Sequence, residues 1–369
     1  MDTQPDPTEP GALRPDPPLP GVDAFTGCLL GGAVGDALGA PVEFLSLAEI
    51  RSRFGPAGIQ DYAPAYGRYG AITDDTQMTL FTAEGLLRAR NRWLSKGIVS
   101  IEGMVHHAYL RWLQTQEIDR QPPLARCDGH LQRLPELWND RAPGSTCLSA
   151  LRTGVIGSTT DPINDSKGCG GVMRVAPVGL VLQSDAFTTG CNVAAITHGH
   201  PDGYLPAGFL SAVLSRIVRG ADLEAALRLS LRELLSWARA GGSGECYAAL
   251  TGAIRMAGQA PATPESIELL GEGWVGEEAL AISVFCALKA RTFEEGVLLA
   301  VNHGGDSDST GAITGNILGA LWGRRSIPSS LLNRLELCNE IERIARDLYT
   351  NFIDPGLAGP IDWETYPGY

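Results

Sequence analysis

The chain has 369 residues, of which 44% are hydrophobic and 19% charged, a composition that predicts a large packed core and excludes a chain disordered throughout. Its net charge of -13 and isoelectric point of about 4.9 exclude the broad basic surface of a nucleic-acid-binding protein. No apolar run approaches the roughly 20 residues of a membrane-spanning helix, and no basic-then-apolar segment predicts a secretory signal, so we expect a cytoplasmic protein that binds neither nucleic acid nor membrane.

The first element is an N-terminal extension, residues 1–22, which is rich in proline and acidic residues and almost free of large apolar side chains. Because such a segment buries too little surface to offset the entropy lost on ordering, we predict that it is disordered or polyproline-like. The alternative is an arm that docks on a partner. We expect one domain to follow, over residues 23–369.

The next segment, residues 27–44, carries glycines at four-residue intervals, and a segment at 311–323 repeats the pattern. Glycine inside a helix costs up to about 1 kcal/mol relative to alanine, so several on one face need a reason. The plainest reason is the close approach of two helices. The two segments are therefore predicted to be buried core helices that touch each other or flank the functional site.

The remaining apolar residues recur with the period of a helix. Residues 101–113, 205–218 and 223–238 each gather their apolar side chains on one face. Thr292 and Glu295 form a capping-box pattern ahead of a further apolar helix. No convincing run of alternating apolar and polar residues is bounded by turn signals. The sequence therefore predicts an all-α fold, with many helices packed around one core.

Acidic side chains occur in three glycine-rich or apolar places: Asp36 with Glu43, residues 73–75, and residues 306–310. Taken singly, each cluster is more often a helix cap than a set of ligands. If the acidic turns meet, however, four carboxylates share a small volume and cannot all stay charged without compensation. Magnesium, which prefers carboxylate and hydroxyl oxygens, is one source of compensation, and arginines in a structural network are the alternative.

Five pieces of the sequence resemble, in order, the signature pieces of the ADP-ribosylglycohydrolase family, which includes the dinitrogenase reductase-activating glycohydrolases. They are GCLLGGAVGDALGAPVEF from residue 27, TDDTQMTL from residue 73, KGCGGVMRVAPVGL from residue 167, ITHGHPDGYLPAGFL from residue 196 and NHGGDSDSTGAITGNILGALWG from residue 302. The resemblance spans roughly residues 24–325, and five pieces in order are far more specific than any one of them. It implies an all-α fold with a central cleft that holds two magnesium ions.

The same resemblance implies roles for individual residues by motif match. The metal ligands would be Thr73, Asp74, Asp75, Asp306, Asp308 and Ser309. The carboxylates expected to handle a proton are Glu43, Asp75 and Asp308. Glycines at a helix start let backbone amide groups reach a phosphate. The residues expected to bind ADP-ribose are Gly168, Gly170, Gly171, Val172, Met173 and His198. Arg174 is either a phosphate partner or an arginine anchored in the fold.

The implied reaction is magnesium-dependent hydrolysis of the N-glycosidic bond of an ADP-ribosylated protein, which releases ADP-ribose. The GCGGVMRVAP loop favours an arginine-linked substrate, and ADP-ribosyl-serine, O-acetyl-ADP-ribose and poly-ADP-ribose are the alternatives. A second hypothesis is an immunity protein whose residues 1–22 block a cognate ADP-ribosyltransferase toxin. The acidic residues of the motifs are all present, which argues against an inactive member of the family. The order of the motifs argues against a metal-dependent phosphohydrolase.

Overall fold

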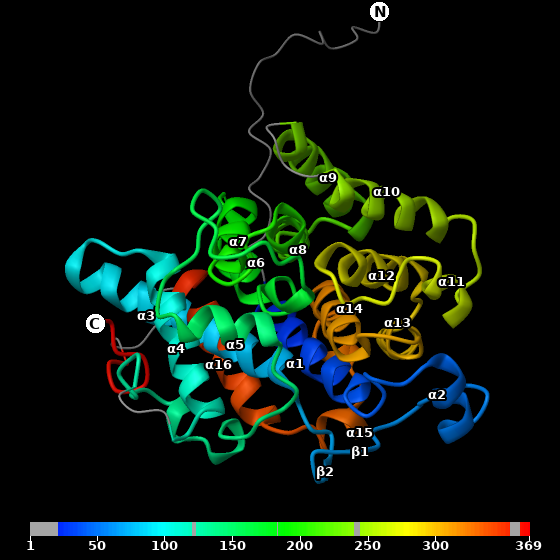
Figure 1. Cartoon of the computed structure of the whole chain (residues 1–369), viewed down its shortest axis with the longest axis horizontal. Coiled ribbons are helices and arrows are strands. Elements are labelled where there is room, and N and C mark those ends of the chain that lie inside the picture. Colours follow the sequence, from blue (N-terminus) through cyan, green and yellow to red (C-terminus); the bar gives the residue numbers. More distant parts are fainter. Residues whose placement is uncertain (1–20, 120–122, 183, 240–243, 355–361) are drawn as a thin grey trace, which may run out of the picture.

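Helices form almost all of the regular structure in the computed structural model, which describes residues 21–119, 123–182, 184–239, 244–354 and 362–369 (Figure 1). The all-α prediction is confirmed. The described strands, β1 (Pro64–Ala65) and β2 (Arg68–Tyr69), form a small antiparallel hairpin that the sequence did not predict, because strands this short show no alternation. The helices are α1 (Val22–Gly39), α2 (Leu47–Phe54), α3 (Asp74–Lys96), α4 (Ile101–Gln116), η1 (Leu131–Arg133), η2 (Pro135–Leu137), α5 (Ser145–Arg152), η3 (Cys169–Gly171), α6 (Ala176–Val181), α7 (Ala186–Ala195), α8 (Pro201–Val218), α9 (Leu223–Arg239), α10 (Glu245–Ala257), α11 (Pro264–Glu268), α12 (Gly276–Lys289), α13 (Phe293–Val301), α14 (Ser307–Trp322), η4 (Arg324–Ser326), α15 (Ser329–Leu332) and α16 (Cys338–Phe352), where η marks a short 3-10 helix.

The amphipathic segments predicted from the sequence are all helical, with small shifts at their ends. Helix α8 begins at Pro201, four residues before the predicted start. Thr292 caps α13 by accepting a hydrogen bond from the amide of Glu295 at 3.1 Å, as predicted. The carboxylate of Glu295 accepts hydrogen bonds from Arg291 instead of the Thr292 amide, so only half of the predicted capping box forms.

Glycines on α1 and α14 face one another, which confirms the predicted contact between these two helices. A Cβ atom on Gly31 would collide with the carbonyl oxygen of Gly315, and the neighbouring glycine steps are equally tight. Figure 1 shows the blue α1 and the orange α14 side by side near the centre of the molecule. Farther along α1, a Cβ on Gly39 would meet the backbone of Asp308. The close contact therefore brings the end of α1 against the acidic start of α14.

The N-terminal extension falls mostly outside the described residues. Helix α1 begins at Val22, the last residue of the predicted extension, and residues 1–20 are not described. The disorder and docking hypotheses for this segment therefore stay predictions. None of the helices described here is both long and apolar enough to cross a membrane.

Candidate active site

Three turns bring predicted carboxylates to one cavity of about 240 Å³. The turn after α1 carries Glu43. At the start of α3, the hydroxyl of Thr73 accepts a hydrogen bond from the amide of Asp75 at 3.3 Å. At the start of α14, the carboxylate of Asp306 accepts one from the amide of Ser309 at 3.3 Å. Asp306 thus caps α14 with its side chain and also lines the cavity, so the capping explanation does not exclude the functional one.

Most of the predicted site residues line this cavity. They are Glu43, Asp74, Asp75, Gly168, Gly170, Met173, His198, Asp306, Asp308 and Ser309. Thr73, Gly171 and Val172 do not line it. The Thr73 side chain is fully buried beneath the acidic turn, and Val172 is fully buried in the hydrophobic core. A Cβ on Gly171 would meet the carbonyl oxygen of Gly203 at 2.7 Å, so this glycine allows close packing on α8.

The glycine turn at residues 168–171 is already partly engaged with the rest of the protein. It forms η3, a 3-10 helix of three residues, rather than the start of a long helix. The amide of Cys169 donates to the carbonyl of Trp274 at 3.1 Å, and the amide of Gly168 donates to the hydroxyl of Ser166 at 3.3 Å. The thiol of Cys169 donates to the carboxylate of Asp306 at 2.8 Å. The turn is thus attached directly to the acidic cluster.

Burial and mutual repulsion dominate the electrostatics of the acidic cluster. Burial, followed by the charge of Asp308, raises the pKa of Asp74, Asp75 and Asp306 well above the ordinary aspartate value. The same two causes raise the pKa of Glu43 to about 11. No lysine or arginine in the described part of the chain forms an ion pair with these carboxylates, so the structural-arginine alternative is not supported. The cluster needs a positive charge from elsewhere to hold its acids ionised.

Comparison with known proteins assigns the fold and this set of motifs to a family. The family model described as ADP-ribosylglycohydrolase matches residues 18–357. This chain belongs to the ADP-ribosylglycohydrolase family.

Two curated relatives and one solved structure of another protein match this chain over nearly nine-tenths of its length. The ADP-ribosyl-[dinitrogen reductase] glycohydrolase of Rhodospirillum rubrum is 26% identical over 333 residues, which cover 88% of this chain and 93% of that protein. The ADP-ribosylarginine hydrolase Tri1 of Serratia proteamaculans (strain 568) is 25% identical over 341 residues, which cover 89% of this chain and 79% of that protein. A solved structure titled "ADP-ribosylglycohydrolase-related protein complex" superposes with a TM-score of 0.66 at 28% identity, covering 89% of this chain and 98% of that chain.

The oxygen atoms in the cavity of this ADP-ribosylglycohydrolase fit a hard divalent cation. Asp75 Oδ1 and Glu43 Oε2 are buried and have no hydrogen-bond partner. Carboxylates with the hydroxyl of Ser309 beside them are the ligands that magnesium prefers. Within the part of the chain that the structure describes, no group of three or more His, Cys, Asp or Glu side chains has the arrangement needed to hold a metal ion. The metal assignment therefore stays a prediction, based on donor chemistry and the unbalanced charge of the acids.

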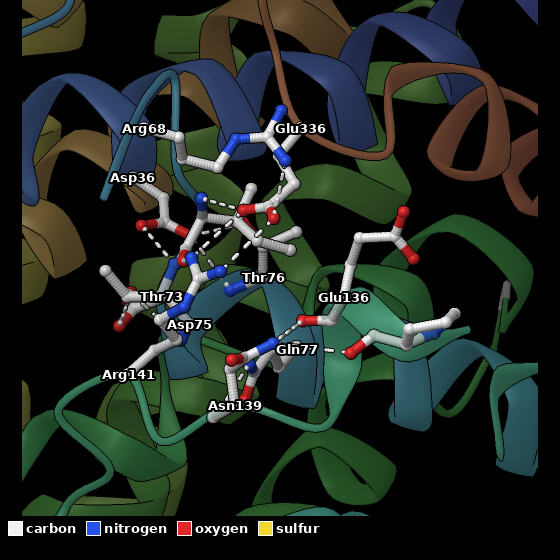
Figure 2. Close-up of polar contacts among 12 residues, drawn as sticks. Asp36, Arg68, Thr73, Asp75, Thr76, Gln77, Glu136, Asn139, Arg141 and Glu336 are labelled. Carbon is white, nitrogen blue, oxygen red and sulfur yellow. Dashed lines mark hydrogen bonds and ion pairs between the residues drawn. The ribbon is translucent and has the colours of Figure 1, made fainter. Parts of the chain in front are cut away.

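Asp36 supports the acidic turn from behind the cavity. Its carboxylate accepts hydrogen bonds from the amide of Thr73, at 3.0 Å to each oxygen, and from the amide of Thr76 at 3.1 Å (Figure 2). The side chain is fully buried, and it is not part of the cavity wall. Asp36 therefore holds the turn that presents Asp74 and Asp75.

The loop before α5 and the first turn of α5 form a part of the site that the sequence motifs did not predict. Residues 142 and 144–147 line the cavity, and the amide of Gly144 donates to Asp74 Oδ2 at 3.3 Å. The P-G-S-T run at residues 143–146, where α5 begins, is a helix-start signal that could have indicated this part of the site. Arg141, beside the loop, pairs with Glu336, 195 positions away in the sequence, and no local pattern signals such a contact (Figure 2).

His198 lines the cavity, whereas Arg174 lies behind it. Arg174 is fully buried, donates to the hydroxyl of Thr197 at 2.7 Å and lies over the ring of Tyr109, 4.2 Å from its centroid. It is therefore anchored in the fold. Burial, together with the charge of Arg174, lowers the pKa of His198 to about 3, so its ring is neutral near pH 7. The Nδ1 atom of that ring contacts the Thr197 hydroxyl at 2.8 Å.

Proposed function

We propose that this chain hydrolyses the N-glycosidic bond of arginine-linked ADP-ribosylated proteins in a magnesium-dependent reaction that releases ADP-ribose. The observation that carries the proposal is the cluster of five carboxylates around one cavity, which has no basic partner among the described residues. Such a cluster favours a bound divalent cation, and a cation site beside a glycine turn suits a substrate with ribose hydroxyls and a diphosphate.

The arginine linkage is supported by the names of two relatives. One is called an ADP-ribosylarginine hydrolase and the other an ADP-ribosyl-[dinitrogen reductase] glycohydrolase. Both match this chain over more than four-fifths of its length, at 88% and 89%. Neither of these two names mentions the alternatives, which are ADP-ribosyl-serine, O-acetyl-ADP-ribose and poly-ADP-ribose.

The site residues would have two roles, metal binding and proton transfer. Asp74, Asp75, Asp306 and Asp308 would hold magnesium, which supplies Lewis-acid polarisation of a water molecule and orientation of the ribose hydroxyls. Glu43 lies at the cavity wall with Oε2 free of hydrogen bonds, which supports a role in proton transfer at the reacting bond. The glycine turn and residues 144–147 form walls of the same cavity, so they would contact the part of the substrate that binds there.

The test is to incubate the full chain with an arginine-ADP-ribosylated protein and magnesium, with EDTA as control, and to quantify free ADP-ribose by chromatography. Release of intact ADP-ribose that EDTA abolishes supports the reaction and the bond type together. Release of AMP instead would indicate a phosphohydrolase. Turnover by the Asp306→Ala variant at the normal rate would overturn the metal assignment.

A second role, as an immunity protein, depends on the N-terminal extension, most of which lies outside the described residues. The motivating observation is its acidic and proline-rich composition directly ahead of α1. A pull-down of a cognate ADP-ribosyltransferase toxin by the full chain, and by a chain lacking residues 1–20, tests it. Equal capture by both forms contradicts a blocking arm.

A further inference from the structure

A second cavity, of about 410 Å³, adjoins the acidic one and shares two wall residues with it, Glu43 and Trp274. Its walls come from the segment between α1 and α2 with the first residue of α2, from the end of α11 and the loop that follows it, and from Gly304 and Gly305 at the turn before α14. Because that turn leads directly into Asp306, a group bound here lies beside the acidic cluster.

Two aromatic side chains form one wall of this second cavity. Phe44 is 70% exposed and Trp274 is 39% exposed, although both are large and apolar. Their rings are stacked, with centroids 5.8 Å apart and planes inclined by 15°. Exposed aromatic rings that face a cavity offer flat surfaces on which a planar or cationic group can stack.

The charged side chains that line this cavity are all acidic. Glu268 and Glu272 contribute carboxylates to it, and no lysine or arginine is among the described residues that line it. At the boundary with the first cavity, Glu43 is 93% buried, since its exposed fraction is 7%, and its Oε2 has no hydrogen-bond partner. The cavity therefore offers negative charge at its rim and an unused buried acceptor at its inner end.

The loop that carries Glu272 and Trp274 is tied to the acidic cavity at both sides. The carbonyl of Glu272 accepts from the amide of Asp306 at 2.8 Å, and the carbonyl of Trp274 accepts from the amide of Cys169 at 3.1 Å. The indole of Trp274 donates to the Glu272 carboxylate at 3.1 Å. The carboxylate of Glu278 accepts from the amide of Glu272 at 3.1 Å. The loop is thus held in place before any ligand binds.

We propose that this second cavity is the subsite for the leaving group and that it recognises the guanidinium of the modified arginine. The inference rests on the proposed function and names the surface that selects its substrate. A guanidinium is planar and cationic, stacks on aromatic faces and pairs with carboxylates through parallel hydrogen bonds. A serine hydroxyl has neither property. An adenine could also stack here, but Glu268 and Glu272 would repel the diphosphate attached to it.

The binding test uses agmatine, a guanidinium on a short chain, and AMP as probes, titrated into the full chain by calorimetry. We expect Glu272→Gln and Trp274→Ala each to weaken agmatine binding about tenfold, because each removes one charged or stacking contact. Glu272→Gln keeps an oxygen for the Trp274 indole while removing the charge. The matched control is Glu294→Gln, an exposed glutamate on α13 outside both cavities, and it should bind agmatine normally.

Agmatine affinity that is unchanged in both variants overturns the subsite, and so does AMP binding that Trp274→Ala weakens while agmatine binding stays the same. In the hydrolysis assay, Glu272→Gln should raise KM for an arginine-linked substrate about tenfold with little change in kcat, and should leave a serine-linked substrate unaffected. An equal rise in KM for both substrates contradicts guanidinium recognition. If no substrate releases ADP-ribose, the proposed function fails, whereas the agmatine titrations still decide whether the cavity binds a guanidinium.

Discussion

The guanidinium of Arg141 donates two hydrogen bonds to the carboxylate of Glu336, at 3.0 and 3.2 Å, inside the protein. Arg141 is 5% exposed and Glu336 is 1% exposed. The same two side chains also hold both backbone polar groups of one residue, because Arg141 donates to the carbonyl of Ile72 at 2.9 Å and Glu336 accepts from its amide at 3.1 Å. Ile72 immediately precedes Thr73, so this pair positions the acidic turn at the start of α3.

Replacing Arg141 with methionine should lower the free energy of unfolding by about 1.5–3 kcal/mol, because the buried Glu336 would lose two hydrogen bonds to a charged group and keep only its ion pair with Arg68 at 2.8 Å. Urea unfolding followed by circular dichroism measures the loss. The matched control is Arg291→Met, whose partner is Glu295 in an exposed pair, with side chains 84% and 46% exposed, and it should cost less than about 1 kcal/mol. Similar small losses in both variants would show that the buried pair does not hold the turn.

The close contact between α1 and α14 predicts that one added methyl group at this contact lowers the stability of the fold. Gly315→Ala should lower the free energy of unfolding by about 1–3 kcal/mol, because the new Cβ would collide with the carbonyl oxygen of Gly31. Gly252→Ala is the control, since no atom lies within 4 Å of its added Cβ, and it should stabilise α10 by up to about 1 kcal/mol. Opposite signs in urea unfolding support the close contact. Stabilisation by both substitutions contradicts it.

Magnesium should stabilise the folded chain, because a cation relieves the repulsion among the buried carboxylates. At a free concentration of 100 times Kd, one bound ion adds about 2.7 kcal/mol to the free energy of unfolding. Thermal unfolding with magnesium, and with EDTA, measures this as a rise in Tm. Asp306→Asn should abolish the rise and should be no less stable than the unaltered chain in EDTA. Asp119→Asn, at an exposed position away from the cavity, should retain the rise.

Stability should also depend on pH through His303, which is buried and whose pKa burial lowers to about 4. Because the unfolded chain binds a proton at about pH 6.5 and the folded chain only near pH 4, this histidine's contribution is lost as pH falls through that window. From pH 7.5 to 5 the loss is about 2 kcal/mol.

The His303→Gln variant, which can still contact the Thr310 hydroxyl, is the test of this pH dependence, because its amide does not titrate. Its free energy of unfolding should fall less than that of the unaltered chain between the same two pH values. Parallel curves for the two proteins would assign the pH dependence to other groups.

The sequence by itself determined the features that depend on local spacing. Apolar periodicity indicated the helices α4, α8 and α9, because one face of a helix must be apolar to be buried. The glycine spacing indicated the contact of α1 with α14, because glycine, which has no Cβ, lets two helix backbones approach closely. The acidic turns were visible because their residues lie within a few positions of one another. The N-terminal arm is still a sequence prediction.

Only the tertiary structure decided which side chains face the cavity. It placed Thr73 and Val172 behind the wall and anchored Arg174 in the fold, although each belongs to a motif that surrounds the site. It also joined residues far apart in the chain, such as Arg141 with Glu336 and Phe44 with Trp274. Motif membership restricts a residue to a segment, whereas the direction and partner of its side chain depend on how distant segments pack against that segment.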